Sequence, residues 1–207
     1  MAYEVFVLYD GYSKTQEFGM KANCTCTLLK GKKNVIVDTM TPWDKDKIVE
    51  ALSHRGLACS DIDYVVCSHG HSDHVGNNNL FLKAKHIVGF EVSFTDHYFI
   101  HPFETGEEYI IDKDLKVIPT PGHTSTDVSV IVNTKDMGVI AITGDLFERE
   151  EDIADPSIWK YIAGSSDPEK QEQNRNKILQ IADWIVPGHG PMFQVTAQMK
   201  SSLSLSN

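Results

Sequence analysis

The most informative stretch of this chain is SHGHSDH, residues 68–74. His69 and His71 are separated by one residue, so an extended backbone sends both imidazoles to the same side, where neutral ring nitrogens can bind a borderline metal ion. Asp73 and His74 follow at once and, because adjacent side chains diverge, a turn can direct this pair toward a second ion. A purely structural loop has no reason to collect three histidines and a carboxylate. The stretch therefore predicts a metal site, and two ions are favoured over one.

Working outward, the same pattern of an apolar run followed by polar residues recurs along the chain. Residues 62–67 form a short apolar run that leads directly into the histidine cluster. The further repetitions are 116–119 before PGH at 121–123, 139–143 before GD at 144–145, and 184–186 before PGHG at 187–190. Polar chemistry thus lies at the ends of strands. Alternating strands and helices with four such loops predict an α/β protein with a layered αββα architecture, a four-layer sandwich.

The remaining segments predict further strands and two helices. We expect strands over residues 3–9, 22–29, 35–38 and 86–90, which are rich in β-branched and aromatic residues. A helix should begin at Thr41-Pro42 and end at Gly56, with an apolar stripe of Ile48, Val49 and Leu52. A second helix is predicted over residues 171–182, with Ile178, Leu179 and Ile181 facing inward.

Size, charge and cysteine content narrow the class of protein. With 207 residues and 41% hydrophobic content we expect one domain over residues 1–200 and a frayed tail at 201–207. A net charge of −10 and a pI near 5.3 argue mildly against a nucleic-acid partner. There is neither a basic, apolar leader nor an apolar run long enough to span a bilayer, so we expect a soluble intracellular protein without a membrane partner. Its four cysteines should be buried thiols.

The order of these motifs resembles the metallo-β-lactamase superfamily, whose signature is HxHxDH, then glycine-histidine, glycine-aspartate and a final glycine-histidine. The resemblance implies two divalent ions, zinc foremost with iron or manganese as alternatives, and a bridging hydroxide for which Asp73 orients or accepts the proton. It also implies that Asp38 supports the ligands from the end of a strand. The implied ligands are His69, His71 and His123 for one ion, Asp73, His74 and His189 for the other, and Asp145 as the catalytic bridge between them.

Individual branches of the superfamily resemble the chain to different degrees. Antibiotic-hydrolysing lactamases place a cysteine or serine where Asp145 stands, and flavodiiron oxygen reductases carry a glutamate in place of His71. Glyoxalase II needs a C-terminal extension that has no counterpart here, so a small-molecule thioester or ester hydrolase is the second hypothesis. Residues 70–77, 144–149 and 185–191 are most similar to a small two-zinc branch. That similarity implies a homodimeric endoribonuclease of the cytosol and nucleus, with histone pre-mRNA 3′ ends as its RNA substrate.

Three features near the ligands have more than one interpretation. Arg149 could contact substrate, or it could pair with Glu148 or Glu150. The aromatic stretch at residues 94–103 could wall a pocket or stack bases, but packing of a loop against the core is favoured. The acidic run formed by Glu148, Glu150, Glu151 and Asp152 is most simply a solvated loop.

Overall fold

Two β-sheets form the centre of the protein, seen in a computed structural model that describes residues 2–202. The first sheet has the strand order β1-β4-β5-β6-β7-β8-β9 and the second has the order β10-β11-β12-β13-β14-β15. The first comprises β1 (Glu4–Tyr9), β4 (Cys26–Lys30), β5 (Val35–Val37), β6 (Tyr64–Cys67), β7 (Lys85–Val88), β8 (Glu91–Phe94) and β9 (His97–Phe99). The second comprises β10 (Tyr109–Asp112), β11 (Leu115–Pro119), β12 (Val128–Asn133), β13 (Val139–Gly144), β14 (Trp184–Pro187) and β15 (Phe193–Gln194).

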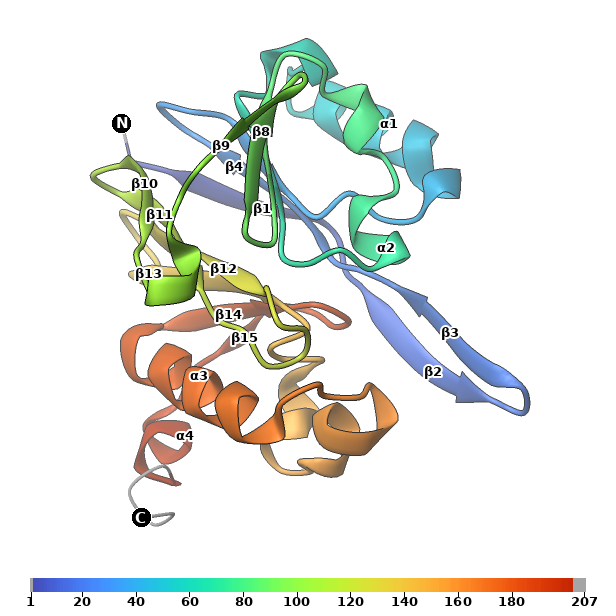
Figure 1. Cartoon of the computed structure of the whole chain (residues 1–207), viewed down its shortest axis with the longest axis vertical. Coiled ribbons are helices and arrows are strands. Elements are labelled where there is room, and N and C mark those ends of the chain that lie inside the picture. Colours follow the sequence, from blue (N-terminus) through green and yellow to red (C-terminus); the bar gives the residue numbers. More distant parts are fainter. Residues whose placement is uncertain (1, 203–207) are drawn as a thin grey trace.

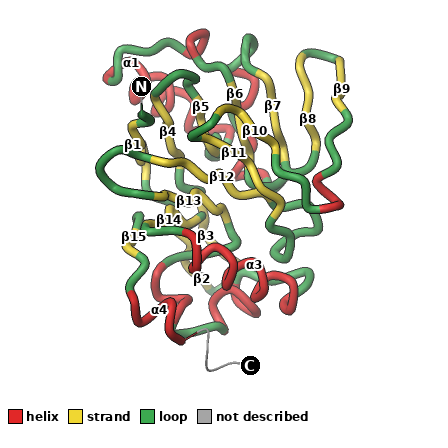
Figure 2. The backbone as a smooth tube through the Cα atoms, turned by 90° about the vertical axis from the view of Figure 1, so that its left-hand side faces the viewer, coloured by secondary structure: helices red, strands yellow, loops and turns green. Residues whose placement is uncertain are grey.

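Helices cover the outer face of each sheet, as Figure 1 shows. The α-helices are α1 (Lys45–His54), α2 (Ser72–Val75), α3 (Pro168–Ile181) and α4 (Ala197–Ser202). Short 3-10 turns occupy Pro42–Asp44, Cys59–Asp61, Asn78–Leu80, Phe103–Thr105 and Glu150–Ile153, and a π-helical turn occupies Ile158–Ile162. The α1 helix lies on the first sheet, whereas α3 and α4 lie on the second (Figures 1 and 2). The predicted αββα sandwich is confirmed.

Three hydrophobic clusters correspond to the layers of this sandwich. The cluster between the sheets joins residues of both, among them Val66 of β6 and Val130 of β12. A second cluster packs Ile48 and Leu52 of α1 against the first sheet, and a third packs Ile178 of α3 against the second sheet. Burial of these apolar surfaces supplies the main stabilisation of the fold.

The sequence predictions differ from the structure mainly near the amino terminus. One strand was expected over residues 22–29, but the chain forms a separate hairpin of β2 (Tyr12–Gln16) and β3 (Gly19–Asn23) before β4 begins at Cys26. The hairpin projects from the body of the molecule (Figure 1), which explains why most of its side chains are exposed. Cys24 and Cys26 are nevertheless buried in one cluster, as free thiols.

Two of the expected inward-facing residues lie at the surface. Val49 of α1 is 41% exposed and Ile181 of α3 is 42% exposed, so each helix buries a narrower stripe than its apolar residues indicate. The frayed tail predicted for 201–207 lies outside the described residues from position 203 onward, and Ser201 belongs to α4. Within residues 2–202, no helix is both long and apolar enough to cross a membrane.

Candidate metal centre

Four polar loops that carry the expected ligands meet at one edge of the sandwich. Strands β5 and β6 are parallel, as are β13 and β14, so the carboxyl ends within each pair lie at the same edge of their sheet. His69, His71, Asp73 and His74 follow β6, His123 follows β11, Asp145 follows β13, and His189 follows β14. The structure therefore brings together all seven residues expected from the sequence.

The first group of side chains consists of His69, His71, His123 and Asp145. The Nδ1 atom of His71 lies 2.8 Å from Nε2 of His69 and 3.2 Å from Nε2 of His123. The Oδ2 atom of Asp145 lies 3.7 Å from Nε2 of His69 and 3.4 Å from Nε2 of His123. Three imidazole nitrogens and one carboxylate oxygen thus converge on a single point, which matches the donor set of a zinc ion.

The second group consists of Asp73, His74 and His189, and it meets the other oxygen of Asp145. That atom, Oδ1, lies 3.2 Å from Nε2 of His74 and 3.3 Å from Nε2 of His189. The Oδ2 atom of Asp73 lies 4.0 Å from Nε2 of His74 and 3.8 Å from Nε2 of His189. Asp145 therefore stands between the two groups, with Oδ2 toward the first and Oδ1 toward the second, although Nε2 of His189 lies 3.3 Å from Oδ2 as well.

The centre is better suited to metal coordination than to hydrogen bonding. Nε2 of His74 and Oδ1 of Asp145 are buried and have no hydrogen-bond partner among the described residues, although they face each other. An unsatisfied buried polar atom of this kind is costly and needs an explanation. Several histidine nitrogens point at the same place, and too few N–H protons lie between them for each lone pair to accept a hydrogen bond. Divalent ions would satisfy them, so the residues present fit a two-metal site.

Burial and charge act in opposite directions on the ligands. Burial, aided by the neighbouring histidines, holds the pKa of His69 well below its ordinary value. Burial also opposes protonation of His189, but Asp145 outweighs it and raises the pKa of His189 to about 9. Burial would raise the pKa of Asp145, yet His189 and His74 overcome that effect and hold it well below its ordinary value. Asp145 is thus a carboxylate in this environment, the form that can bridge two cations.

Neighbouring groups orient the histidine rings. Nδ1 of His123 lies 2.9 Å from the carbonyl oxygen of Gly164, and Nδ1 of His189 lies 3.0 Å from that of Asn23. A carbonyl oxygen only accepts, so each Nδ1 carries a proton, and in the neutral ring that a metal binds it is Nε2 that offers its lone pair to the centre. The surroundings of these two rings thus select the tautomer that can bind metal.

Asp38 supports the other side of the centre, as the resemblance implied. Its carboxylate accepts a 2.8 Å hydrogen bond from the backbone N–H of Ser68 and lies 3.0 Å from Nδ1 of His74. The backbone at Asp38 has a φ of 57°, an uncommon value for a residue other than glycine.

Close backbone packing requires a glycine at position 76, because a Cβ there would lie 2.3 Å from the carbonyl oxygen of Met40. Gly70, by contrast, has open space where a Cβ would lie.

The acidic run after Asp145 was predicted to be solvated, and for two of its members that prediction was wrong. Glu148 is only 2% exposed, and its carboxylate lies within 4.8 Å of ligand atoms of Asp145 and His189. Burial and the charge of Asp145 raise the pKa of Glu148 to about 8. Asp152 is 1% exposed and forms a buried ion pair with Arg175, which lies in α3. No local sequence signal could have found this pair, because its partners are far apart in the chain.

Contacts in the same region bear on the other open interpretations. Arg149 pairs with neither Glu148 nor Glu150; its guanidinium lies 3.8 Å from the carboxylate of Glu151 and donates to the hydroxyl of Ser13. The expectation that the aromatic stretch at residues 94–103 packs on the core is confirmed for Phe103, against which the half-buried His101 packs edge-on. Phe94, Tyr98 and Phe99 are exposed.

The loop that carries His123 contains a further residue that was not expected from the sequence. Asp127 is buried and accepts hydrogen bonds from the backbone N–H groups of Gly122 and Thr124 and from the hydroxyl of Thr124. These bonds fix the loop on both sides of the histidine. A Ser/Thr-rich turn closed by an aspartate, as in residues 124–127, was the available signal.

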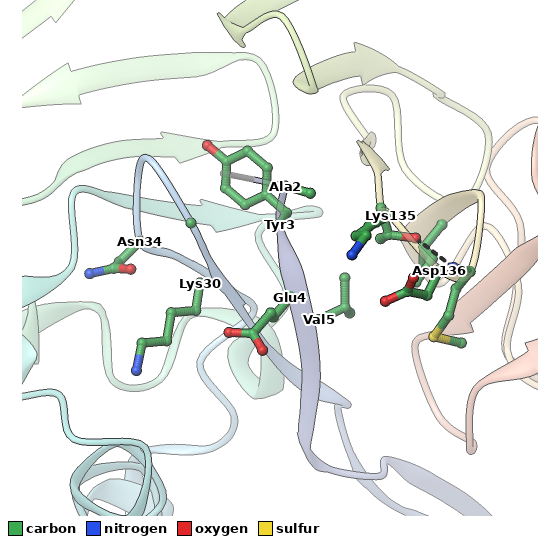
Figure 3. A pocket seen from close by; sticks show the side chains of 12 residues that line it. Ala2, Tyr3, Glu4, Val5, Lys30, Asn34, Lys135 and Asp136 are labelled. Atoms are coloured by element: carbon green, nitrogen blue, oxygen red, sulfur yellow. Dashed lines mark hydrogen bonds between the residues drawn. The ribbon is translucent and has the colours of Figure 1, made fainter.

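A large cavity lies away from this centre. It has a volume of about 690 Å³ and is lined by residues of the β1 amino end and the β12–β13 turn. Figure 3 shows β1 passing between Lys30 on one side and Lys135 with Asp136 on the other. Ile140 of β13 lines the cavity, whereas Asp145 follows the opposite end of that strand. The cavity is therefore separate from the metal centre.

An αββα sandwich with histidines and aspartates gathered at one edge defines a class of metallohydrolases. The sequence model of the "Metallo-beta-lactamase superfamily" matches residues 20–189, and the chain belongs to this family. It is 42% identical over 196 residues to Metallo-beta-lactamase domain-containing protein 1 of Xenopus laevis, covering 93% of this chain and 82% of the relative.

Solved structures show the same fold. A metallo-beta-lactamase-type protein from Thermotoga maritima superposes with a TM-score of 0.70 at 22% identity, covering 94% of this chain and all of that one. An N-acyl homoserine lactone hydrolase, with its product bound at the catalytic metal centre, superposes with a TM-score of 0.60 at 16% identity, covering 87% and 89% of the two chains. At these identities the likeness concerns the fold alone.

Proposed function

We propose that this metallohydrolase is a two-zinc phosphodiesterase that cleaves RNA, with histone pre-mRNA near its 3′ end as the substrate. The observation that carries the proposal is the position of Asp145, whose Oδ2 faces His69 and His123 while its Oδ1 faces His74, with Nε2 of His189 3.3 Å from both oxygens. Two ions bound by these groups would suit a phosphodiester, because they could neutralise its charge and stabilise both the attacking and the leaving oxygen.

Each side chain has a distinct task in this reaction. Zinc ions bound by the two groups would lower the pKa of a shared water and neutralise charge on the phosphate. Asp73 is the more solvent-accessible carboxylate, with 19% of its side chain exposed against 5% for Asp145. It is therefore placed to orient the attacking water and accept its proton. Asp145 balances the positive charge of the site, and Asp38 keeps His74 in position.

The choice of RNA over other phosphodiesters rests on the resemblance of residues 144–149 and 185–191 to the endoribonuclease branch. The same resemblance supports a homodimer of the cytosol and nucleus. The net charge of −10 opposes the approach of a polyanion, so binding should depend mostly on the metals and on a local site.

The test is cleavage of a histone-type pre-mRNA 3′ fragment by zinc-loaded protein whose metal content has been measured. We expect about two zinc ions per chain and metal-dependent cuts, with His71→Ala and a chelator-treated sample inactive. A reproducible content of one ion, unchanged by added zinc or iron, would contradict the two-metal assignment. Intact RNA alongside turnover of a thioester or lactone would contradict the nuclease.

A small ester, thioester or lactone is the second candidate. It is favoured by the lactone hydrolase of the same fold, in which the product of ester hydrolysis is bound at the metal centre. A lactone needs only one polarised carbonyl and one hydroxide, which the same two groups of ligands could supply. Parallel assays on RNA and on small esters distinguish the two candidates directly.

A further inference from the structure

A groove of about 340 Å³ lies beside the metal centre, between α3 and the loop that carries His123. One wall is aromatic: the rings of Phe90 and Phe103 stack with centroids 5.4 Å apart, and Phe90 is half-buried. The opposite wall is helical and basic, with Lys170 and Lys177 of α3 at its rim. The groove thus offers a ring surface and two cations to the same occupant.

The loop that carries His123 links the groove to the metal centre. Pro121 and Ser125, which line the groove, stand on either side of His123 in the chain. The side-chain amide of Asn174, another groove residue, donates a 2.7 Å hydrogen bond to the carbonyl oxygen of Pro121. One turn earlier in α3, the amide of Gln171 donates to the backbone carbonyl of Asp145. A ligand in the groove would therefore lie next to the loop that holds a metal ligand.

The charges of α3 are divided between its faces. Lys170, Asn174 and Lys177 follow each other at helical spacing and line the groove, whereas Glu172 pairs with Lys160 outside it. Lys170 and Lys177 form no ion pair with any residue in 2–202, unlike Lys160. Their spacing places both cations on the groove side of α3. They are available for a partner that carries negative charge.

We infer that this groove is a binding site for single-stranded RNA next to the point of cleavage, a base packing on Phe90 while Lys170 and Lys177 contact phosphates. The inference rests on the proposed nuclease function for its choice of ligand. Unpaired bases stack on aromatic side chains, and lysines contact the backbone without reading sequence. The two lysines would attract RNA locally, although the net negative charge of the protein repels it.

One groove residue works against this attraction and gives a test of opposite sign. Glu104 is exposed and lines the groove next to Phe103. Its negative charge would repel phosphates that approach the lysines. Glu104→Gln should therefore tighten RNA binding, whereas loss of the lysines should weaken it.

The experiment measures binding of a fluorescein-labelled, phosphorothioate-linked 12-nucleotide RNA, chosen to resist cleavage, by anisotropy with zinc-loaded protein. We compare wild type with Lys170→Ala/Lys177→Ala and with a control of equal charge, Lys45→Ala/Lys83→Ala, which changes two exposed lysines outside the groove. The groove variant should raise Kd about tenfold, and the slope of log Kd against log salt should fall by about 1.4, at ~0.7 per phosphate contact. The control should stay within about twofold of wild type. Phe90→Leu, which keeps an apolar side chain, should weaken binding by about fivefold.

Cleavage by zinc-loaded protein separates this inference from the proposed function. The groove variant should raise KM for the RNA fragment and leave kcat and the cleavage of a dinucleotide unchanged. If the groove and control variants bind RNA equally, or wild type does not bind it, the inference is overturned. If the groove variant cuts RNA with an unchanged KM, the groove inference is also overturned, whereas the proposed nuclease function stands. RNA bound through the lysines but never cut would contradict only the nuclease.

Discussion

Replacing Asp38 by asparagine should weaken metal binding without unfolding the protein. Asp38 is 2% exposed, and its carboxylate holds both the Ser68 backbone and Nδ1 of His74. The carboxylate selects the tautomer of His74 whose proton is on Nδ1, which leaves the Nε2 lone pair free for a metal. An asparagine can still accept from Ser68, but its amide would donate to Nδ1 and move the ring proton to Nε2. The substitution therefore acts on one ligand.

The size of the effect follows from the role of such supporting carboxylates. Their loss costs about 10–100-fold in metal affinity, which is about 1.4–2.8 kcal/mol. Asparagine tolerates a positive φ better than most residues, so the backbone at Asp38, with its φ of 57°, should not be strained. The loss should fall on the ion held by Asp73, His74 and His189 rather than on the other.

Competition with a chromophoric chelator measures the two zinc affinities separately. We expect one affinity to fall by this factor in Asp38→Asn and the other to change little, while the circular dichroism of metal-depleted protein stays that of wild type. Asp46→Asn, an exposed change in α1, is the matched control. Two unchanged affinities would refute the tautomer argument, and an equal loss of both would show that Asp38 stabilises the whole centre.

Three further changes test other parts of the structure. Asp145→Asn should lower the rate of hydrolysis of any confirmed substrate about 100-fold or more, because the amide keeps the shape of the side chain but loses its charge. The circular dichroism should be unchanged. Near-normal turnover would show that Asp145 does not bridge two metal ions. Arg175→Met should lower the free energy of unfolding by about 3–5 kcal/mol in urea titrations, because it leaves the carboxylate of Asp152 buried and unpaired; adding Asp152→Asn should restore part of the loss. Burial raises the pKa of Asp127 to about 6, so the folded protein holds this proton at a pH where the unfolded chain has lost it. Stability of wild type relative to Asp127→Asn should therefore fall by up to about 3 kcal/mol as pH rises from about 4 to 6, and a pH-independent difference would contradict this.

The parts of the fold that could be predicted are those with a local signal. Each ligand follows an apolar strand, and the polar residues after β6, β11, β13 and β14 directly predicted loops at one edge of a sheet. The β2–β3 hairpin lacked such a signal. Its strands do not alternate between apolar and polar residues, because the hairpin projects into solvent and neither face is buried along most of its length.

The environment of the site was less predictable than its ligands. Glu148 and Asp152 look like any other members of an acidic loop, and only the arrival of Arg175 from α3 explains why Asp152 can be buried. The pairing depends on tertiary structure, since 3.6-residue periodicity says nothing about which helix covers which loop. The same limit applies to Asn174, whose link to Pro121 joins α3 to the His123 loop.

Under the proposed function, the arrangement of the site would let an acidic protein keep a cationic centre and still admit an anionic substrate. Asp145, Asp73 and Asp38 would neutralise much of the charge of two bound divalent ions, and the buried pair of Asp152 and Arg175 adds no net charge near them. A substrate phosphate would therefore meet a modest positive field confined to the edge of the sandwich. Beyond that edge the chain repels polyanions, so a substrate must enter where the metals and a few lysines outweigh the surrounding acids. If RNA is the substrate as proposed, the overall charge would restrict where RNA binds without preventing its binding.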